Sequence, residues 1–326
     1  MSIARNVGAV RQRASLRSAA VVVLPMAVAL AVLAGKWTLI GSGAGRLGSA
    51  DGEWLSAGCL AAVMTWVCAA TAQQGAVVET LPPGRLLAAQ FAASAANHVL
   101  PAGVGGNAVN LRFLVRRGLS PTRALAALAV RAAAAVIGRV VLLLVVLALF
   151  PDALHIRRVV SGRPQLPAHP LLLSAGGAVA LAGLFLLLRY ARRLGARLRE
   201  FVVSVARDVR AVHHRRARVA ALWGGSLAFP AMHTAVLVSV VRAVHAPVPV
   251  SGVVVAYLCA STATGWVPTP AGLGSLDAVL ALALVTAGAS PVAATSAVLG
   301  YRLLTAWLPL IPGVVVLGVM VRRREL

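Results

Sequence analysis

The chain has 326 residues, of which 60% are hydrophobic and 12% are charged, and its mean hydropathy is +0.87. Soluble domains average about 45–50% apolar and about 25% charged residues, so this composition excludes an ordinary soluble protein as well as a disordered chain. Lysine and arginine outnumber aspartate and glutamate by 31 to 8, but the arginines lie between apolar stretches of membrane-spanning length, which favours an anionic lipid leaflet over nucleic acid as the partner.

Six apolar stretches are long enough to cross about 30 Å of hydrocarbon at about 1.5 Å per residue. The first follows a basic N-terminal segment. A cleavable signal peptide is the alternative for that first stretch, but many apolar runs follow it, so we expect an uncleaved span. The six expected spans are residues 18–40, 54–72, 124–150, 170–190, 219–241 and 291–321.

Two further apolar stretches are interrupted by proline and glycine. Residues 86–111 are broken at LPAGVGG, and residues 252–287 are broken at VPTPAGLG. Such breaks expose backbone N–H and C=O groups that hydrocarbon cannot satisfy, so they are tolerated only where protein or a water-filled cavity covers them. We therefore expect two re-entrant helical hairpins, with two fully spanning hairpins as the alternative that the sequence leaves open.

The two hairpins belong to an internal repeat. Three landmarks recur in the same order, and the intervals between them differ by at most one residue, which predicts duplicated halves. The matching pairs are PAGVG (101–105) with PAGLG (270–274), GLSP (118–121) with GASP (288–291), and Arg131 with Arg302.

Arginine placement predicts the topology. Arginines crowd before the first span, in RFLVRRGLSPTR, throughout residues 189–218 and in the terminal RRREL, so by the positive-inside rule both termini lie in the cytoplasm and the protein is a multi-pass protein of the cytoplasmic membrane. The turn RRGLSP is basic and its repeat mate TAGASP is uncharged, so the hairpins should enter from opposite faces, as in inverted-repeat transporters. Three arginines in the predicted outward loop, at 157, 158 and 163, depart from this rule.

These patterns predict an all-α polytopic protein with about six spans and two re-entrant hairpins. Residues 191–218 form either a basic amphipathic helix on the inner leaflet or a basic loop without a lipid role. The segments are a basic N-terminus (1–17), a first membrane half (18–150), an outward loop and span (151–190), the basic segment (191–218), a second membrane half (219–321) and a cytoplasmic tail (322–326).

Three arginines lie inside predicted spans. Arg139 is about 22 Å and Arg302 about 16 Å along its span, whereas Arg131 is shallower. Each central arginine costs about 2.5–3.5 kcal/mol, and Asp277 is the only acid at comparable depth, so an anion such as phosphate would balance the surplus positive charge. The alternative is structural: one arginine pairs with Asp277, and water or backbone carbonyls solvate the others.

The breaks add backbone N–H groups at half-helix N-termini, where the helix dipole also favours anions. Asn97 and Asn107 flank the first break and either line a cavity or cap the broken helices. Asp277 is a helix N-terminal charge, a partner of Arg302 or a titrating group. The candidate binding residues are Arg131, Arg139, Arg302, Asp277, Asn97, Asn107, Pro101, Gly103, Gly105, Gly106, Pro270, Gly272 and Gly274.

The chain offers no catalytic, metal or cofactor signature. The three cysteines lie in apolar stretches without a CxxC pair, the histidines show no HExxH spacing, and no serine or threonine sits beside an evident base. We therefore expect no enzyme activity, no cofactor and no metal.

Two motifs carry a family resemblance, namely NHVLPAGVGGNAVNLRFLVRRGLS and PTPAGLGSLDAVLALALVTAG followed by YRLLTAWLP. The chain resembles, over nearly its whole length, the transmembrane flippase-like family found in lysylphosphatidylglycerol synthases and in stand-alone membrane proteins. It departs from the family pattern at Ala102 and Ala271, where glycine is usual, and at Asp277, where glutamate is commoner. The synthases also carry a soluble aminoacyl-transfer domain, whereas this sequence stops at RRREL, so we expect a stand-alone member that does not aminoacylate lipids.

The resemblance and the charge surplus predict the same function. We expect a flippase-like transporter that binds and translocates an anionic phospholipid or a polyprenyl-phosphate-type lipid. The alternative is a non-transporting membrane subunit that scaffolds a lipid- or glycan-modifying enzyme. The sequence leaves open whether a second copy of the chain or an enzyme is a further partner.

Overall fold

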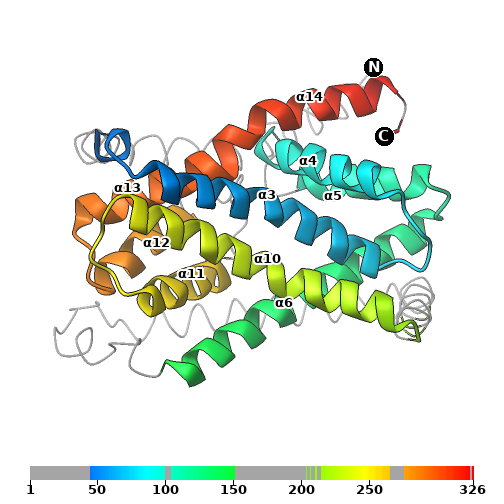
Figure 1. Ribbon diagram of the computed structural model, residues 1–326. Helices are drawn as coiled ribbons and strands as arrows, with labels where there is room; N and C mark the ends of the chain where they lie inside the picture. Colours follow the sequence, from blue (N-terminus) through cyan, green and yellow to red (C-terminus); the bar gives the residue numbers. More distant parts are fainter. Residues whose placement is uncertain are drawn as a thin grey trace, which may run out of the picture.

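The computed structural model describes residues 45–99, 104–150, 214–264, 275–323 and 325–326, with residues 203, 206 and 210. All regular structure in these ranges is helical (Figure 1), which confirms the all-α class. The elements are α3 (Gly52–Gly75), α4 (Pro83–Val99), α5 (Val104–Arg116), α6 (Pro121–Leu149), α10 (Arg216–Ala243), α11 (Val250–Thr264), α12 (Ser275–Thr286), α13 (Pro291–Arg302), the π-helix η4 (Leu303–Trp307) and α14 (Leu308–Arg322).

Four of the six predicted spans appear as helices that are long and apolar enough to cross a membrane. They are α3, α6, α10 and the continuous helical segment Pro291–Arg322. The predicted spans 18–40 and 170–190 lie outside the described residues, as does most of the basic segment 191–218, whose last three residues begin α10.

Each interrupted stretch appears as two described helices, one on either side of its predicted break. The first is divided into α4 and α5, and α5 continues to Arg116, five residues beyond the predicted end. The second is divided into α11 and α12. The breaks themselves, residues 100–103 and 265–274, lie outside the described residues.

Helices α3 and α10 pack against each other in antiparallel orientation. The amide of Asp51, which caps the start of α3, donates to the carbonyl of Ala243 at the end of α10 over 3.0 Å. At the other end, a Cβ on Gly75 would lie 2.2 Å from the backbone nitrogen of Leu222. Glycine is therefore required there, because any side chain would force the two backbones apart.

The halves repeat the same order of elements in opposite directions along this helix pair. The turns that precede α6 and α13 share one conformation, with a glycine at positive φ (Gly118 at 93°, Gly288 at 111°) and a serine N-cap followed by proline. Figure 1 places α4 and α5 at one end of the α3–α10 pair, and α11 and α12 at the other. Helix α4 packs against α14 of the second half, and α11 packs against α6 of the first.

The outer faces of α6 and α14 are apolar and exposed. In water, such faces would mark interaction surfaces, and in this chain they are suited to contact lipid. They carry Leu125, Val136, Ile137, Val140, Val141, Leu144, Val145 and Leu149 on α6, and Leu308, Ile311, Val314, Val315, Val319 and Val321 on α14.

Two large hydrophobic cores and one small cluster (Ala76, Ala134 and Leu222) lie inside the bundle. One is formed mainly by α10, α11, α12 and α13, and the other by α4, α5 and the start of α6. Along α6, Ala127 belongs to the second core and Val146 to the first. Arg131 and Arg139 therefore lie along α6 between the two large cores, on either side of Ala134 of the small cluster.

Candidate anion-binding pocket

A pocket of about 320 Å³ contains both of these arginines in its wall, to which five helices and η4 contribute. Residues from both halves of the repeat meet there, so a relative movement of the halves would change its shape. The described lining residues are Thr65, Trp66, Ala69 and Ala72 from α3, Gln90, Ala93, Ser94 and Asn97 from α4, Gly106, Asn107 and Asn110 from α5, Arg131, Ala132, Ala135 and Arg139 from α6, Gly225, Ser226, Phe229, Pro230 and His233 from α10, and Thr305 from η4.

Two arginines of α6 dominate the charge of this pocket. Arg131 and Arg139 are eight residues apart, which places them about 12 Å apart along the helix axis. The Nε atom of each is buried and has no hydrogen-bond partner among the described residues. Arg139 donates from Nη1 to the carbonyl of Ser261 over 3.2 Å. A buried guanidinium with an unused donor favours an anion that can accept from it.

The third predicted arginine, Arg302, forms an ion pair instead of lining the pocket. Arg302, which is 7% exposed, ends α13, and its Nε lies 2.5 Å from Oδ1 of Asp277. Asp277 lies in the first turn of α12, so it is both a helix N-terminal charge and the partner of Arg302. Neither residue is among the described lining of the pocket.

A chain of amides joins α4 to α5 at the pocket wall. Gln90 donates to Oδ1 of Asn110 over 2.9 Å, and Asn110 donates to the carbonyl of Gly106 over the same distance. The amide of Gly106 donates to Oδ1 of Asn97 over 2.6 Å. Asn97 therefore caps the start of α5 and also lines the pocket, while Asn107 is exposed and lines it too.

Gly105 and Gly106 permit the close crossing of the two helices. A Cβ on Gly105 would lie 2.1 Å from the carbonyl oxygen of Ala96, and one on Gly106 would lie 2.6 Å from Nδ2 of Asn97. The remaining predicted site residues, Pro101, Gly103, Pro270, Gly272 and Gly274, lie outside the described residues.

Several pocket residues were not singled out in the sequence, although a signal for them exists. Gln90 and Ser94 follow the spacing i, i+4, i+7 with the predicted residue Asn97, which places one polar stripe on α4. On α10, Ser226 and His233 are seven residues apart in an apolar helix, and both line the pocket. His233 also contacts the hydroxyl of buried Tyr301 through Nδ1 at 2.9 Å.

Pro230 leaves a backbone carbonyl of the same wall without its usual helical hydrogen bond. Because proline has no N–H, it cannot donate to the carbonyl of Ser226, which is four residues before it in α10. The Oγ atom of Ser226 is buried and also has no partner among the described residues. The α10 wall therefore offers polar groups that a bound molecule could satisfy.

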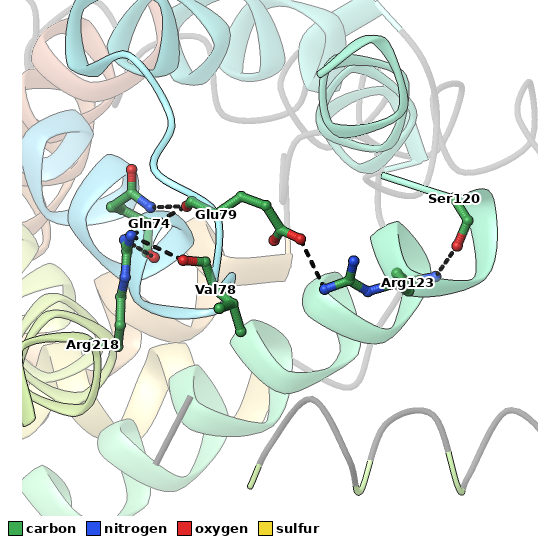
Figure 2. Close-up of polar contacts among 6 residues, drawn as sticks. All are labelled: Gln74, Val78, Glu79, Ser120, Arg123 and Arg218. Carbon is green, nitrogen blue, oxygen red and sulfur yellow. Dashed lines mark hydrogen bonds and ion pairs between the residues drawn. The ribbon is translucent and has the colours of Figure 1, made fainter. Parts of the chain in front are cut away.

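Beyond one end of the pocket, Arg218 of α10 holds the loop that connects α3 to α4 (Figure 2). Its Nη1 donates to the carbonyl of Gln74 over 2.9 Å. Its Nη2 donates to the carbonyls of Val78 and Glu79 over 3.2 and 3.3 Å, and to Oγ1 of Thr80 over 3.1 Å. One side chain of the second half thus binds four acceptors of the first half.

The same loop is also tied to its own half. The Gln74 side chain donates to the carbonyl of Glu79 and accepts from the amide of Leu81, over 2.9 and 2.8 Å. The Glu79 carboxylate lies 2.8 Å from Nη2 of Arg123 on α6, as Figure 2 shows. We call the contacts of Arg218 and Arg123 with this loop the clasp. On their helices, Arg123 and Arg218 precede the pocket residues Arg131 and Gly225 by about two turns.

The end of the bundle with the clasp is strongly basic. At the opposite end, the described charges are balanced, with Arg46 and Arg242 against Asp51 and Glu53. The basic end carries Arg85, Arg116, Arg117, Arg123, Arg215, Arg216, Arg218, Arg322 and Arg323, with Glu79 and Glu325 as its acids.

Comparison with known families agrees with the apolar, membrane-spanning character of these helices. The chain matches the family described as "Lysylphosphatidylglycerol synthase TM region" over residues 2–313. A comparison with curated proteins finds no match. Because the family match covers nearly the whole chain, the protein belongs to this family and is a multi-pass membrane protein, which confirms the resemblance inferred from its two motifs.

Proposed function

We propose that the protein binds the phosphate group of an anionic lipid with Arg131 and Arg139 and moves that lipid between the two leaflets. The observation that carries the proposal is that both arginines line one pocket, each with a buried Nε atom that has no partner among the described residues. Guanidinium binds phosphate oxygens through several directed N–H donors, so a phosphate that contacts either arginine would satisfy its Nε atom. Membership in a family linked to lipid handling supports a lipid as the source of the phosphate.

The proposed orientation places the basic end, with the clasp, in the cytoplasm. The excess of arginine at this end and the balanced charges at the other support this orientation through the positive-inside rule. In the described ranges, the C-terminal residues lie at the basic end, because Glu325 approaches Arg85 at the start of α4.

The lengths of the broken helices support re-entrant hairpins. Helices α4 and α5 have 17 and 13 residues, and α11 and α12 have 15 and 12, so each is about 18–26 Å long. These lengths are below the thickness of about 30 Å of a hydrocarbon core. Two hairpins at opposite ends would allow one central site to face each leaflet in turn, as in inverted-repeat transporters.

The test is lipid transfer in liposomes that contain the purified protein. We expect faster transfer of labelled phosphatidylglycerol or polyprenyl phosphate between leaflets. Arg131→Gln and Arg139→Gln should each slow the transfer about tenfold, because each removes a charge-assisted hydrogen bond. Arg112→Gln, which changes an exposed arginine of α5 and gives the same total charge, is the matched control.

The outcomes separate the two functions that the sequence leaves open. Equal rates for Arg131→Gln, Arg139→Gln and Arg112→Gln would contradict the assigned site. Binding of an anionic lipid without transfer of any tested lipid would contradict transport and favour a membrane subunit that presents a lipid to an enzyme.

A further inference from the structure

We propose that His233 is a third group that binds the lipid phosphate, with Nε2 as the donor, and that Tyr301 positions it by fixing which ring nitrogen carries the proton. This inference rests on the proposed function, because it adds a donor to the same site. It starts from the position of His233 in the pocket wall.

His233 lies at the same end of the pocket as Arg139, and both side chains reach helix α11. Arg139 donates to the carbonyl of Ser261 over 3.2 Å. Tyr257 lies one turn before Ser261, and its ring is nearly parallel to that of His233, with an interplanar angle of 8° and centroids 6.1 Å apart. Because both pocket residues approach the same face of α11 one turn apart, a phosphate bound to Arg139 would also lie close to His233.

Three aromatic side chains hold the imidazole ring in one orientation. Phe229, one turn earlier on α10, packs edge-to-face against it with centroids 4.7 Å apart. Tyr257 lies along one of its faces, and Tyr301 is tilted against it with centroids 6.0 Å apart. Both tyrosines are buried. A donor on a ring that is already held in place loses little conformational entropy when a ligand binds.

The hydroxyl of Tyr301 determines which nitrogen of His233 carries the proton. This hydroxyl lies 2.9 Å from Nδ1. Enclosure by aromatic rings favours the neutral imidazole, which has one donor and one acceptor, because a buried charge is costly. An imidazole nitrogen is a stronger hydrogen-bond acceptor than a phenol oxygen, so the hydroxyl donates to Nδ1. The proton of the ring then lies on Nε2.

Tyr257 is compatible with this direction of donation. Its side chain is hydrogen-bonded to that of Tyr301. A hydroxyl can donate and accept at once, so Tyr301 accepts from Tyr257 while its own proton is directed to Nδ1. The opposite order, in which Nδ1 donates to Tyr301, would leave Nε2 as an acceptor, which cannot bind a phosphate oxygen.

The position of Tyr301 behind the wall determines where Nε2 points. The two nitrogens lie on different edges of the imidazole ring, and Tyr301 occupies the edge that carries Nδ1. The described lining of the pocket includes His233 and not Tyr301, so the ring lies between Tyr301 and the cavity. Nε2 therefore faces the cavity, where it adds a directed donor beside the charge of Arg139.

The experiment compares two amide replacements of His233 in the purified full chain. The probe is the fluorescent lipid, phosphatidylglycerol or polyprenyl phosphate, that binds the wild type more tightly in nanodiscs of phosphatidylcholine. The amide nitrogen of glutamine reaches the position of Nε2, whereas that of asparagine reaches the position of Nδ1. We expect His233→Asn to bind about tenfold more weakly, because a hydrogen bond to a charged phosphate is lost. His233→Gln should bind within about threefold of the wild type.

The role of Tyr301 has a spectroscopic readout of its own. In NMR spectra of protein with isotopically labelled histidine nitrogens, the ring signals of His233 are those that disappear in His233→Gln. We expect the wild type to carry the proton on Nε2, and the lipid to shift the Nε2 signal more than the Nδ1 signal. Tyr301→Phe removes the hydroxyl and keeps the ring, so it should give a mixture of the two tautomers and bind the lipid about threefold more weakly.

Each outcome bears on the proposal. Equal affinities of His233→Asn and His233→Gln would overturn the role of His233 as a donor and leave the arginine site intact. A wild-type ring with its proton on Nδ1, or an unchanged tautomer in Tyr301→Phe, would overturn the role of Tyr301 as a positioning residue. Failure of the wild type to bind either lipid would overturn the proposed function and this inference together.

Discussion

Arg302 and Asp277 form a nearly buried ion pair in the second half of the chain, with side-chain exposures of 8% and 25%. The aligned positions of the first half are Arg131 and Ala108, because PAGVGGNA matches PAGLGSLD. The first half therefore keeps the arginine but lacks its acid. The pair in the second half joins α12 to α13, while the arginine of the first half lines the pocket with an unused Nε donor.

Asp277→Asn should lower the stability of the protein by about 3 kcal/mol, because it removes the carboxylate that lies against a buried guanidinium. The measurement is thermal or denaturant unfolding in detergent. Arg302→Gln should be similarly destabilising, and the double variant should lose less than the sum of the two single losses. Strict additivity of the two losses would contradict the pairing.

The opposite result is expected for Arg131→Gln and Arg139→Gln. For Arg131→Gln, which removes a buried guanidinium with an unsatisfied Nε, unfolding in the absence of anionic lipid should occur at the wild-type temperature or above it, with a gain of up to about 1 kcal/mol. For Arg139→Gln, loss of the hydrogen bond to the carbonyl of Ser261 offsets this gain, so its unfolding temperature should stay near that of the wild type. Addition of phosphatidylglycerol should stabilise the wild type more than either variant. A large loss of stability in lipid-free detergent would instead indicate a structural role.

Local chemistry explains which parts of the fold the sequence predicts. The broken helices and the paired turns at Gly118 and Gly288 depend on glycine, proline and serine within a few residues, so their positions could be predicted. The pairing of Arg302 with Asp277 was one of several alternatives, because the sequence does not show which deep arginine approaches the acid.

The composition of the pocket could be predicted only in part. Arg131, Arg139, Asn97 and Asn107 are recognisable as polar residues in apolar surroundings, and the structure brings them to one pocket. The polar wall from α10 could not be placed, because its contribution depends on the close packing of α3 against α10. Gly225 allows this packing, since a Cβ there would lie 2.6 Å from the nitrogen of Ala72.

Arg218→Gln should weaken the clasp and lower stability by about 1–2 kcal/mol, because three backbone carbonyls lose a donor. The ion pair between Glu79 and Arg123 joins side chains that are 38% and 41% exposed, so it contributes at most about 1 kcal/mol. In unfolding measurements, Arg218→Gln should therefore be less stable than Glu79→Gln. Arg216→Gln changes an exposed arginine of the same helix turn and should behave as the wild type.

Gly105→Ala should disrupt the crossing of α4 and α5. The added Cβ would lie 2.1 Å from a backbone oxygen, so the helices must separate, at a cost of about 1–3 kcal/mol. Because Gly106 and Asn97 line the pocket beside this crossing, the affinity of the purified protein for phosphatidylglycerol should fall as well. Gly84→Ala is the matched control, since a Cβ on Gly84 at the start of α4 meets nothing within 4 Å. Equal unfolding temperatures for both variants would contradict the close crossing.

The orientation of the two repeat turns can be tested at equivalent positions. Arg116 and Thr286 are both exposed, and each lies two residues before the positive-φ glycine of its turn. The structure places the two turns at opposite ends of the α3–α10 pair, so single cysteines at 116 and 286 should react with impermeant maleimide from opposite sides of the membrane. Both single-cysteine variants are made in a protein in which Cys59, Cys68 and Cys259 have been replaced, so that only the introduced cysteine can react.

The charges near the two turns predict which turn faces the cytoplasm. The turn after Arg116 and Arg117 belongs to the basic end, so Arg116→Cys should be labelled only when the reagent reaches the cytoplasm, and Thr286→Cys should be labelled in intact cells. Labelling of both from one side would contradict the opposed turns, and with them alternating access of one site to two leaflets. If position 116 is labelled from outside and position 286 from the cytoplasm, the turns still lie on opposite sides of the membrane. The clasp would then lie outside, which would contradict its assignment to the cytoplasm.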